Sequence, residues 1–261
     1  MTERKYSTGL VLSGGGTRGF AHLGVLQALN EAGIFPDVIS GTSAGALVGV
    51  LYADGYSPSE IMEMTSSGSR LDYMRPAVPR EGLLQISGIV KMLKANLRAT
   101  SFEELKIPLF VAATDMNNGK PHYFSKGELI NPVIASSSIP VLFQPVIINN
   151  ICYLDGGILD NMPVAPIDNQ CRFLIGSYVN PVCYIEKISG LINIAERAFM
   201  LRMSEEIDEK SDKFDLLIAP RELMHYKILD PEKAHELFSL GYKATIEKLE
   251  KFDAKKTVLN K

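Results

Sequence analysis

The chain has few cysteines, few histidines and no long apolar run, and these shortages argue against particular kinds of protein and site. Its 261 residues include three cysteines, Cys152, Cys171 and Cys183, and four histidines. An odd number of cysteines without a C-x-x-C pair argues against a disulfide framework and against a zinc site. We therefore expect a protein of a reducing compartment, and no cluster of metal ligands is visible in the sequence.

We also expect neither a membrane-spanning segment nor a signal segment. No stretch reaches the ~18 uninterrupted apolar residues that a spanning helix needs, and no signal segment precedes the first predicted strand. The net charge of −3 gives no basic field that would attract nucleic acid. We expect a soluble cytoplasmic protein, at most peripheral to a membrane and without a nucleic-acid partner. Its oligomeric state does not follow from the sequence.

Strand-like and helix-like patterns alternate along the chain. With 46% hydrophobic and 22% charged residues, the composition suits a protein that buries a full core. Strands are predicted at 8–12, 37–40, 109–113, 122–124, 146–148, 151–154, 173–179 and 214–219; helices are predicted at 20–32, 44–53, 60–65, 86–98, 127–137, 188–210 and 231–252. Such alternation predicts an α/β fold, with a largely parallel sheet and helices on both faces. We expect a single domain over 1–261, with a motif-bearing core at about 7–180 and a helical C-terminal part at about 185–261.

Ser43 stands at the centre of a G-x-S-x-G pattern between a predicted strand and a predicted helix. The pattern is formed by Gly41, Ser43 and Gly45, and the helix begins at Ala44. In this setting the pattern is typical of a nucleophile elbow, in which a serine occupies a sharp and strained turn. The pattern alone is weak, because an ordinary glycine-rich turn can match it by chance.

A second glycine-rich turn, residues 14–19, follows the first predicted strand. Its sequence G-G-G-T-R-G matches the dinucleotide fingerprint G-x-G-x-x-G. That fingerprint also requires an acidic residue at the end of the second strand, whereas Asp37 comes before this strand. Consecutive glycines can instead present backbone N–H groups as an oxyanion hole. We favour the oxyanion hole, with a nucleotide loop and a plain tight turn as the alternatives.

A serine nucleophile needs a base, and Asp155 is the best candidate. Asp155 follows a predicted strand and precedes Gly156 and Gly157, so it can take the serine proton directly if burial raises its pKa. The alternative for the D-G-G pattern, taken alone, is a surface turn. The histidines fit less well: His22 is predicted in the core, and His225 stays open as a base. Asp115 is predicted to form an Asx turn rather than to compete with Asp155.

Together these three motifs, in this order, resemble the patatin-like phospholipase family over residues 7–180. The likeness includes A-T-D-M-N-N-G at 113–119 and A-S-S-S-I-P at 135–140. It implies a three-layer α/β/α fold and a Ser–Asp dyad, in which Ser43 attacks an acyl ester and Asp155 serves as base. It also implies an oxyanion hole formed by Gly14, Gly15, Gly16 and Ala44, with Thr17, Arg18, Gly19, Gly41, Gly45, Gly156 and Gly157 as the other motif residues.

The function expected from this resemblance is hydrolysis of acyl esters of phospholipids, lysophospholipids or related lipids, with no cofactor. Two alternatives stay open: a nucleotide-binding oxidoreductase that uses residues 14–19, and a non-catalytic regulatory protein of the same fold. Arg18 is expected to steady the glycine loop or to attract a phosphate head group, or else to be a surface residue.

Residues 66–100 are the least regular part of the core and could form a lid or an acyl-binding wall. The predicted helix at 86–98 carries Lys91, Lys94 and Arg98 on one side, which would suit an anionic interface. We favour a helix that packs on the core and leaves a solvated basic edge.

Overall fold

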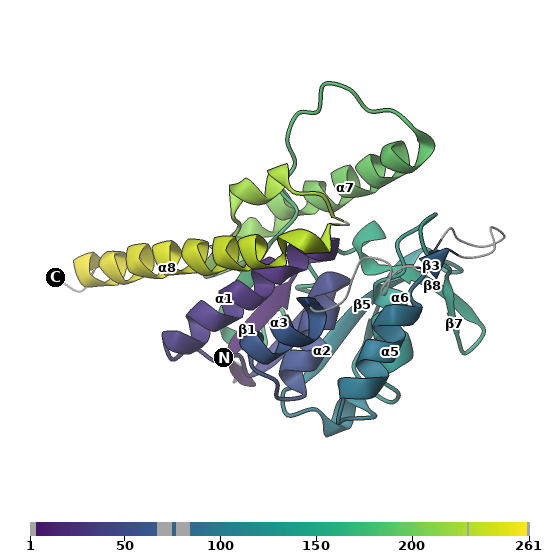
Figure 1. Ribbon diagram of the computed structural model, residues 1–261. Coiled ribbons are helices and arrows are strands. Elements are labelled where there is room, and N and C mark those ends of the chain that lie inside the picture. The colour runs from purple at the N-terminus through teal and green to yellow at the C-terminus, as the bar shows by residue number, and fades with distance from the viewer. Residues whose placement is uncertain (1–3, 67–74, 77–83, 229, 260–261) are drawn as a thin grey trace.

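A mixed sheet runs through the computed structural model, which describes residues 4–66, 75–76, 84–228 and 230–259 (Figure 1). The strand order is β10-β9-β1-β2-β5-β8-β7, and β6 pairs with β5 outside this order. The strands are β1 (Tyr6–Leu12), β2 (Val38–Thr42), β5 (Leu109–Asp115), β6 (Lys120–Phe124), β7 (Val146–Ile148), β8 (Ile151–Asp155), β9 (Cys171–Ser177) and β10 (Leu216–Ile218), with β3 (Arg75–Pro76) and β4 (Leu84–Gln85) as a separate pair. Strands β10, β9, β1, β2 and β5 run parallel, which confirms the predicted α/β class. The antiparallel strands β6, β7 and β8 all lie on the β5 side.

The helices fall close to the predicted ranges. They are α1 (Phe20–Glu31), α2 (Ala44–Ala53), α3 (Pro58–Ser66), α5 (Ser87–Asn96), α6 (Ile130–Ser136), α7 (Leu191–Lys210) and α8 (Ala234–Leu259), with short 3-10 turns η1 (Gly16–Gly19), η2 (Phe102–Glu104), η3 (Gly156–Ile158), η4 (Ser211–Lys213), η5 (Arg221–His225) and η6 (Pro231–Lys233). A capping box starts α3. The Ser57 hydroxyl accepts the Glu60 N–H, and the Glu60 carboxylate accepts the Ser57 N–H.

Side chains alternate between the two faces of β1 and feed two apolar clusters. Leu10 and Leu12 belong to the larger cluster, which also contains Leu26 of α1 and Leu51 of α2. Val11 points to the other face and joins a smaller cluster that includes the 162–167 segment, against which Ile207 of α7 packs. Strand β1 is therefore buried on both faces, as expected for a parallel strand in the middle of an α/β sheet.

One edge of β5 brings the ends of two other strands together. On this edge β2 pairs with β5 as far as Thr42, which lies opposite Ala112. The next residue of β5, Ala113, lies opposite Asp155, the last residue of β8. Because β6 pairs with β5 over the same residues, it must occupy the other edge. Strands β2 and β8 therefore meet end to end, and the residues that follow β2 adjoin Asp155.

The C-terminal helix α8 lies along α1 (Figure 1). Two glycines allow the close approach. A Cβ on Gly24 would lie 2.6 Å from the Tyr242 nitrogen, and one on Gly241 would lie 2.7 Å from the Ala21 carbonyl carbon. Side chains are thus excluded where the two helix backbones touch.

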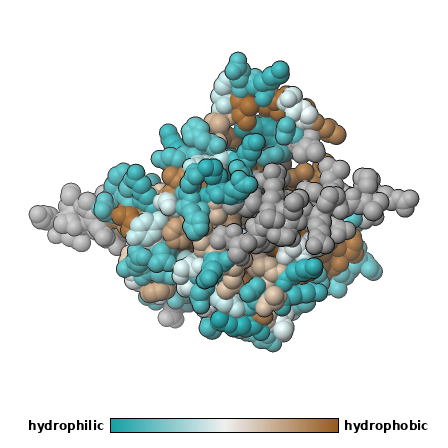
Figure 2. All heavy atoms as spheres, viewed as in Figure 1, coloured by the Kyte–Doolittle hydropathy of each residue, from teal (hydrophilic) through white to brown (hydrophobic). Residues whose placement is uncertain are grey.

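Hydrophilic residues cover much of the face drawn in Figure 2, with apolar ones scattered among them. Such scattered exposure is ordinary for a globular protein. Among the helices of the described ranges, none combines the length and the apolar character needed to cross a membrane.

Candidate active site

Ser43 occupies the turn between β2 and α2 in a strained conformation. Its φ of 52° and ψ of −118° lie in a region that non-glycine residues rarely adopt. A Cβ on Gly41 would lie 2.7 Å from the backbone of Gly45, and one on Gly45 would lie 2.6 Å from the Leu12 carbonyl carbon. The small residues of G-x-S-x-G are thus required by chain packing. The predicted strand–turn–helix context of Ser43 is confirmed.

The Ser43 hydroxyl donates a hydrogen bond to the Asp155 carboxylate, with 2.6 Å between Oγ and Oδ2. Asp155 is completely buried, and its other carboxylate oxygen accepts the Gly157 N–H at 2.8 Å. Its own N–H donates to the Ser138 carbonyl, and its carbonyl accepts from the Thr114 hydroxyl, both at 2.9 Å. The carboxylate that faces Ser43 is therefore held in one orientation.

Burial raises the pKa of Asp155 from its ordinary 3.8 to about 7, against the opposing effects of the hydrogen bonds from Ser43 and Gly157. A carboxyl group in a low-dielectric site disfavours its charged form, which explains the direction. A pKa near neutrality suits a group that must both take and return a proton at physiological pH.

His22 lies in the core, as predicted. Its Nε2 lies 2.9 Å from the Ser13 carbonyl and must carry the proton, so Nδ1 accepts from the Ser177 hydroxyl at 2.7 Å. Burial lowers the pKa of this imidazole to about 4, so it is neutral at physiological pH. No histidine occurs among the described residues that line the pocket at Ser43.

Asp115 forms the predicted Asx turn. Its carboxylate accepts the backbone N–H groups of Asn117 and Asn118 and the side-chain amide of Asn118, at 2.8–3.0 Å. The bond from the Asn118 side chain lowers the pKa of Asp115 below its ordinary value. This carboxylate is committed to the turn between β5 and β6.

Hydrogen bonds to later segments fix the first residues of the glycine loop. The Gly14 N–H donates to Asn161 Oδ1 at 3.0 Å, and the Gly14 carbonyl accepts from Asn180 Nδ2 at 2.7 Å. The expectation that Gly14 helps to form the oxyanion hole needs correction, because its N–H already has a buried partner. Local sequence patterns carry no signal of this hydrogen bond, because Asn161 lies far from Gly14 in the sequence.

The glycine loop and the start of α2 meet at Ser43. The first N–H groups of a helix have no acceptor within it, and η1 begins at Gly16 while α2 begins at Ala44. A Cβ on Gly14 would lie 3.2 Å from the Ser43 Cβ, and Gly16 lines the same pocket as Ser43 and Ala44. Backbone N–H groups at such positions favour a negative charge nearby.

Arg18 steadies the loop, one of the roles expected, but it is buried and not at the surface. Its guanidinium donates to the Tyr226 carbonyl from Nε at 2.9 Å and from Nη2 at 2.6 Å, and to the Pro181 carbonyl at 3.1 Å. Burial lowers its pKa to about 10, which leaves it charged at neutral pH. These bonds engage the groups that a phosphate would need.

Ser136 supports the elbow, a role that sequence reasoning missed. Its hydroxyl accepts the Ser43 N–H at 2.8 Å and donates to the Ala112 carbonyl at 2.6 Å. The only signal in the sequence was the serine run at 136–138. This run belongs to the family resemblance, but the resemblance assigned no role to Ser136.

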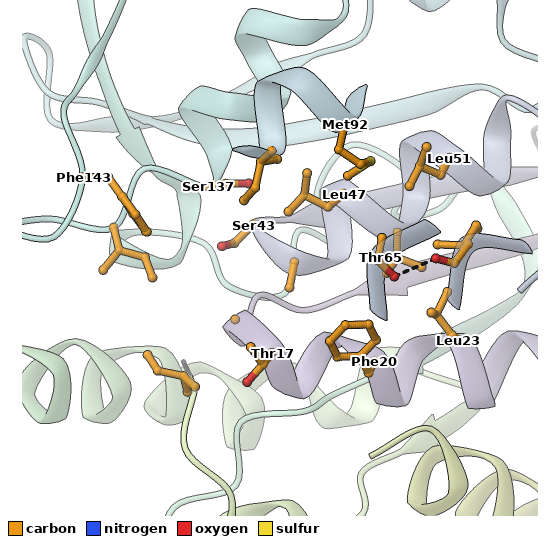
Figure 3. A pocket seen from close by; sticks show the side chains of 18 residues that line it. Thr17, Phe20, Leu23, Ser43, Leu47, Leu51, Thr65, Met92, Ser137 and Phe143 are labelled. Atoms are coloured by element: carbon orange, nitrogen blue, oxygen red, sulfur yellow. Dashed lines mark hydrogen bonds between the residues drawn. The ribbon is translucent and has the colours of Figure 1, made fainter. Parts of the chain in front are cut away.

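A pocket of about 170 Å³ opens at Ser43 and follows α2 (Figure 3). Leu47 and Leu51 line it from α2, with Phe20 and Leu23 opposite on α1. The other lining residues are Gly16, Thr17, Gly19, Ala44, Val48, Ile61, Thr65, Ile89, Met92, Ser137, Ile139, Phe143 and Ile228. None of these carries a charge. The distance from Ala44 to Leu51 along α2 corresponds to about 10 Å, so the pocket can hold an extended apolar chain.

Helix α5 packs on the core, the arrangement that the sequence favoured. Leu93 is buried, whereas Lys91 and Lys94 are exposed, and the Arg98 guanidinium lies 4.0 Å from the Tyr56 ring centroid. Through Ile89 and Met92 the same helix forms part of the pocket wall. A lid over 66–100 stays a prediction, because residues 67–74 and 77–83 lie outside the described ranges.

The nucleotide alternative lacks its acidic residue. The Asp37 carboxylate accepts the Thr8 N–H at the start of β2, whereas ribose would bind at the opposite, carboxyl end. That end is taken by Thr42, whose hydroxyl donates to the Asp160 carbonyl, and by Ser43. Over the described ranges, no group of three or more His, Cys, Asp or Glu side chains is placed to hold a metal ion.

Comparison with known proteins gives a family match over most of the core. The family model for patatin-like phospholipases matches residues 10–168. An uncharacterized NTE family protein of Mycobacterium bovis is 36% identical over 161 residues, which are 60% of this chain and 44% of that protein. The lysophospholipase nte1 of Aspergillus fumigatus is 33% identical over 171 residues, covering 60% of this chain and 11% of that protein. The chain thus spans less than half the length of these relatives.

A solved structure shares the fold. The crystal structure of VipD from Legionella pneumophila matches with a TM-score of 0.56 and 17% identity, over 95% of this chain and 67% of that chain. At this identity the likeness concerns the arrangement of helices and strands alone. It extends the similarity beyond residue 168, where the family model ends.

Proposed function

Because this chain belongs to the patatin-like phospholipase family, we propose that it hydrolyses acyl esters of lipids through Ser43 and Asp155. The observation that supports this proposal best is the 2.6 Å hydrogen bond between the two side chains. It lies in a buried site, at an apolar pocket without charged lining residues.

In the proposed reaction, Ser43 Oγ attacks the acyl carbonyl carbon while its proton passes to Asp155. The carbonyl oxygen becomes an oxyanion that accepts hydrogen bonds from the N–H groups of Gly15, Gly16 and Ala44. Loss of one such donor typically costs ~2.7–4 kcal/mol of transition-state stabilisation. Asp155 then gives the proton to the departing alcohol. A water molecule then attacks the acyl-enzyme and gives a proton to Asp155. The bond between Ser43 Oγ and the acyl carbon breaks, the fatty acid leaves, and Asp155 returns the proton to Ser43 Oγ.

The pocket favours an acyl chain as the group next to the scissile carbonyl. Burial of apolar surface stabilises such a chain by roughly 25 cal/mol per Å², and no lining residue offers a charge to a head group. The fungal relative described as a lysophospholipase supports a lipid substrate. The proposal covers phospholipids, lysophospholipids and related esters. Peripheral contact with a membrane stays a prediction, which co-sedimentation with lipid vesicles tests.

A non-catalytic protein of this fold would have no need to retain a strained Ser43 beside a buried carboxylate. Strain of this kind costs on the order of 1–3 kcal/mol and clusters at active sites. A fluorophosphonate probe, which labels activated serines, separates the two functions. Labelling of the wild type together with turnover of a lipid ester supports the enzyme.

Replacement of either dyad member should abolish hydrolysis. We expect Ser43→Ala to lose labelling and turnover, and Asp155→Asn to lose turnover by ~10³-fold or more, because a missing base removes the proton acceptor. The measurement is a screen of purified protein against a lipid panel, with circular dichroism to show that the variants fold. The exposed residues Ser189 and Asp212 supply the matched controls Ser189→Ala and Asp212→Asn, which should retain full turnover. Undiminished turnover in Asp155→Asn would show that Asp155 is not the catalytic base, and would contradict the proposed dyad.

A further inference from the structure

A short C-terminal segment lies over the glycine loop. Residues 226–228, here called the strap, directly follow η5. The Thr17 N–H donates to the Ile228 carbonyl at 2.8 Å, and the Thr17 hydroxyl donates to the Lys227 carbonyl at 3.1 Å. The Thr17 hydroxyl also accepts the Asp230 N–H at 3.1 Å. Thr17 thus binds the strap and Asp230.

Arg18 adds a second and stronger attachment. Its forked donors bind the Tyr226 carbonyl twice, at 2.6 and 2.9 Å, and the Pro181 carbonyl once, at 3.1 Å. The side chain is almost fully buried, so its charge depends on these carbonyls for solvation. A lysine carries the same charge but lacks the planar fork that serves both carbonyls.

The strap also borders the loop and the pocket. Ile228 is buried and lines the pocket with Ser43. A Cβ on Gly16, which has a φ of +57°, would collide with the Ile228 carbonyl and lie 3.2 Å from the Ile228 Cβ. The conformation of Gly16 is therefore matched to the strap.

We propose that the strap is a positioning element of the active site. Through Thr17 and Arg18 it holds the N–H groups of Gly15 and Gly16 toward the oxyanion that forms beside Ser43, and through Ile228 it closes the acyl pocket. This inference rests on the function proposed above. The strap lies outside residues 10–168, which the family model matches. The inference therefore assigns a role to the C-terminal part of the chain.

The physical basis is that oxyanion donors work only when they are held in place. They must lie 2.7–3.1 Å from the developing charge, and a displacement of ~1 Å can cost ~10²-fold in rate. Gly16 directly precedes Thr17, so a loosened Thr17 moves a donor. Ground-state binding of the acyl chain depends on the pocket and should change less.

The test compares Thr17→Val with Thr17→Ser, because valine keeps the shape of threonine and serine keeps the hydroxyl. We expect Thr17→Val to lower kcat and the rate of fluorophosphonate labelling by about tenfold, with KM within about twofold of the wild type. Thr17→Ser should restore both rates to within about twofold of the wild type. Labelling reports on the same donors, because the phosphoryl oxygen gains charge as Ser43 Oγ attacks phosphorus and fluoride leaves.

Arg18→Lys is the second variant, with the exposed Arg221 changed to lysine as its matched control. We expect kcat and labelling to fall by about 10- to 100-fold in Arg18→Lys and to stay unchanged in Arg221→Lys. Thermal melts of all variants show whether the fold is retained.

Two results would count against the proposal in distinguishable ways. A wild type that neither labels nor turns over any ester defeats the proposed function and this inference together. An active wild type, with Thr17→Val and Arg18→Lys that keep full kcat and labelling rates whatever their melting temperatures, leaves the proposed function standing and overturns the role of the strap.

Discussion

Burial of the Asp155 carboxyl sets the pH range in which the proposed dyad can work. As a base it must be ionised, and its pKa is raised to about 7 by burial. We expect kcat/KM to increase with pH through an inflection near 7 and to level off above it. The measurement is a pH–rate profile from pH 5 to 9 on a soluble ester whose own hydrolysis is subtracted. A flat profile over this range would contradict a catalytic base whose pKa burial raises to about 7.

The same carboxyl should make the fold less stable as pH rises. Between its ordinary pKa of 3.8 and the folded value of about 7, the folded protein keeps a proton that the unfolded chain has lost. The stabilisation from this proton is complete below about pH 4 and is lost as pH approaches 7. We therefore expect Asp155→Asn to be more stable than the wild type at pH 8, by on the order of 1–4 kcal/mol.

Urea melts of both proteins at pH 5 and pH 8 check this prediction. The advantage of Asp155→Asn should be smaller at pH 5, where the wild-type carboxyl is mostly protonated. Equal stability of the two proteins at both pH values would show that the carboxyl is not buried as described.

At the scale of elements, β5 is the template of the site. One edge of β5 pairs with β2 as far as Thr42 and with β8 from Asp155. The two strand ends therefore meet although they lie far apart in the sequence. Helix α6 adds the third part, because Ser136 bridges the Ser43 N–H and the Ala112 carbonyl. The candidate dyad thus depends on strand register, which a shift of one residue would destroy.

The contact between α1 and α8 predicts whether Gly241→Ala raises or lowers the stability of the fold. Helix propensity favours alanine over glycine by ~1 kcal/mol, so Gly241→Ala would stabilise an isolated helix. In the folded protein the added Cβ would lie 2.7 Å from the Ala21 carbonyl carbon. We expect a net destabilisation of about 1–3 kcal/mol, seen as a lower melting temperature. Ser239→Ala, on the exposed side of α8, is the control and should change stability little.

For the whole molecule, the two halves of the chain build one site. Strand β9 pairs with β1, and residues after it hold the glycine loop through Asn180 and the strap. Met203 of α7 reaches Gly157, where a Cβ would lie 2.8 Å from its sulfur. The single-domain organisation expected over 1–261 stays a prediction, and these contacts are the observations in its favour.

Hydrolysis by the whole protein should survive a chelator. The proposed steps use a carboxylate, a hydroxyl and backbone N–H groups, and the described ranges contain no cluster of three or more metal-ligating side chains. We expect turnover in excess EDTA to match turnover without it. Activity that is lost in EDTA and restored by an added metal would contradict the metal-free reaction.

The sequence by itself determined what local spacing can encode. Periodicity gave the alternating strands and helices, and the glycines at 41 and 45 placed Ser43 in a turn between a strand and a helix. The Asx turn at Asp115 and the core position of His22 followed from the same kind of reasoning.

Only the tertiary structure decided which distant groups meet. Nothing in the spacing places Asn161 on the Gly14 N–H, the Tyr226 carbonyl on Arg18 or Ser136 on the Ser43 N–H. The physical reason is that periodic patterns report which face of an element is buried, whereas strand register and chain crossings decide the partners. The pairing of Ser43 with Asp155 depends on both the sequence and the tertiary structure. Motif resemblance suggested the pair, and the shared edge of β5 brings the two side chains within 2.6 Å of each other.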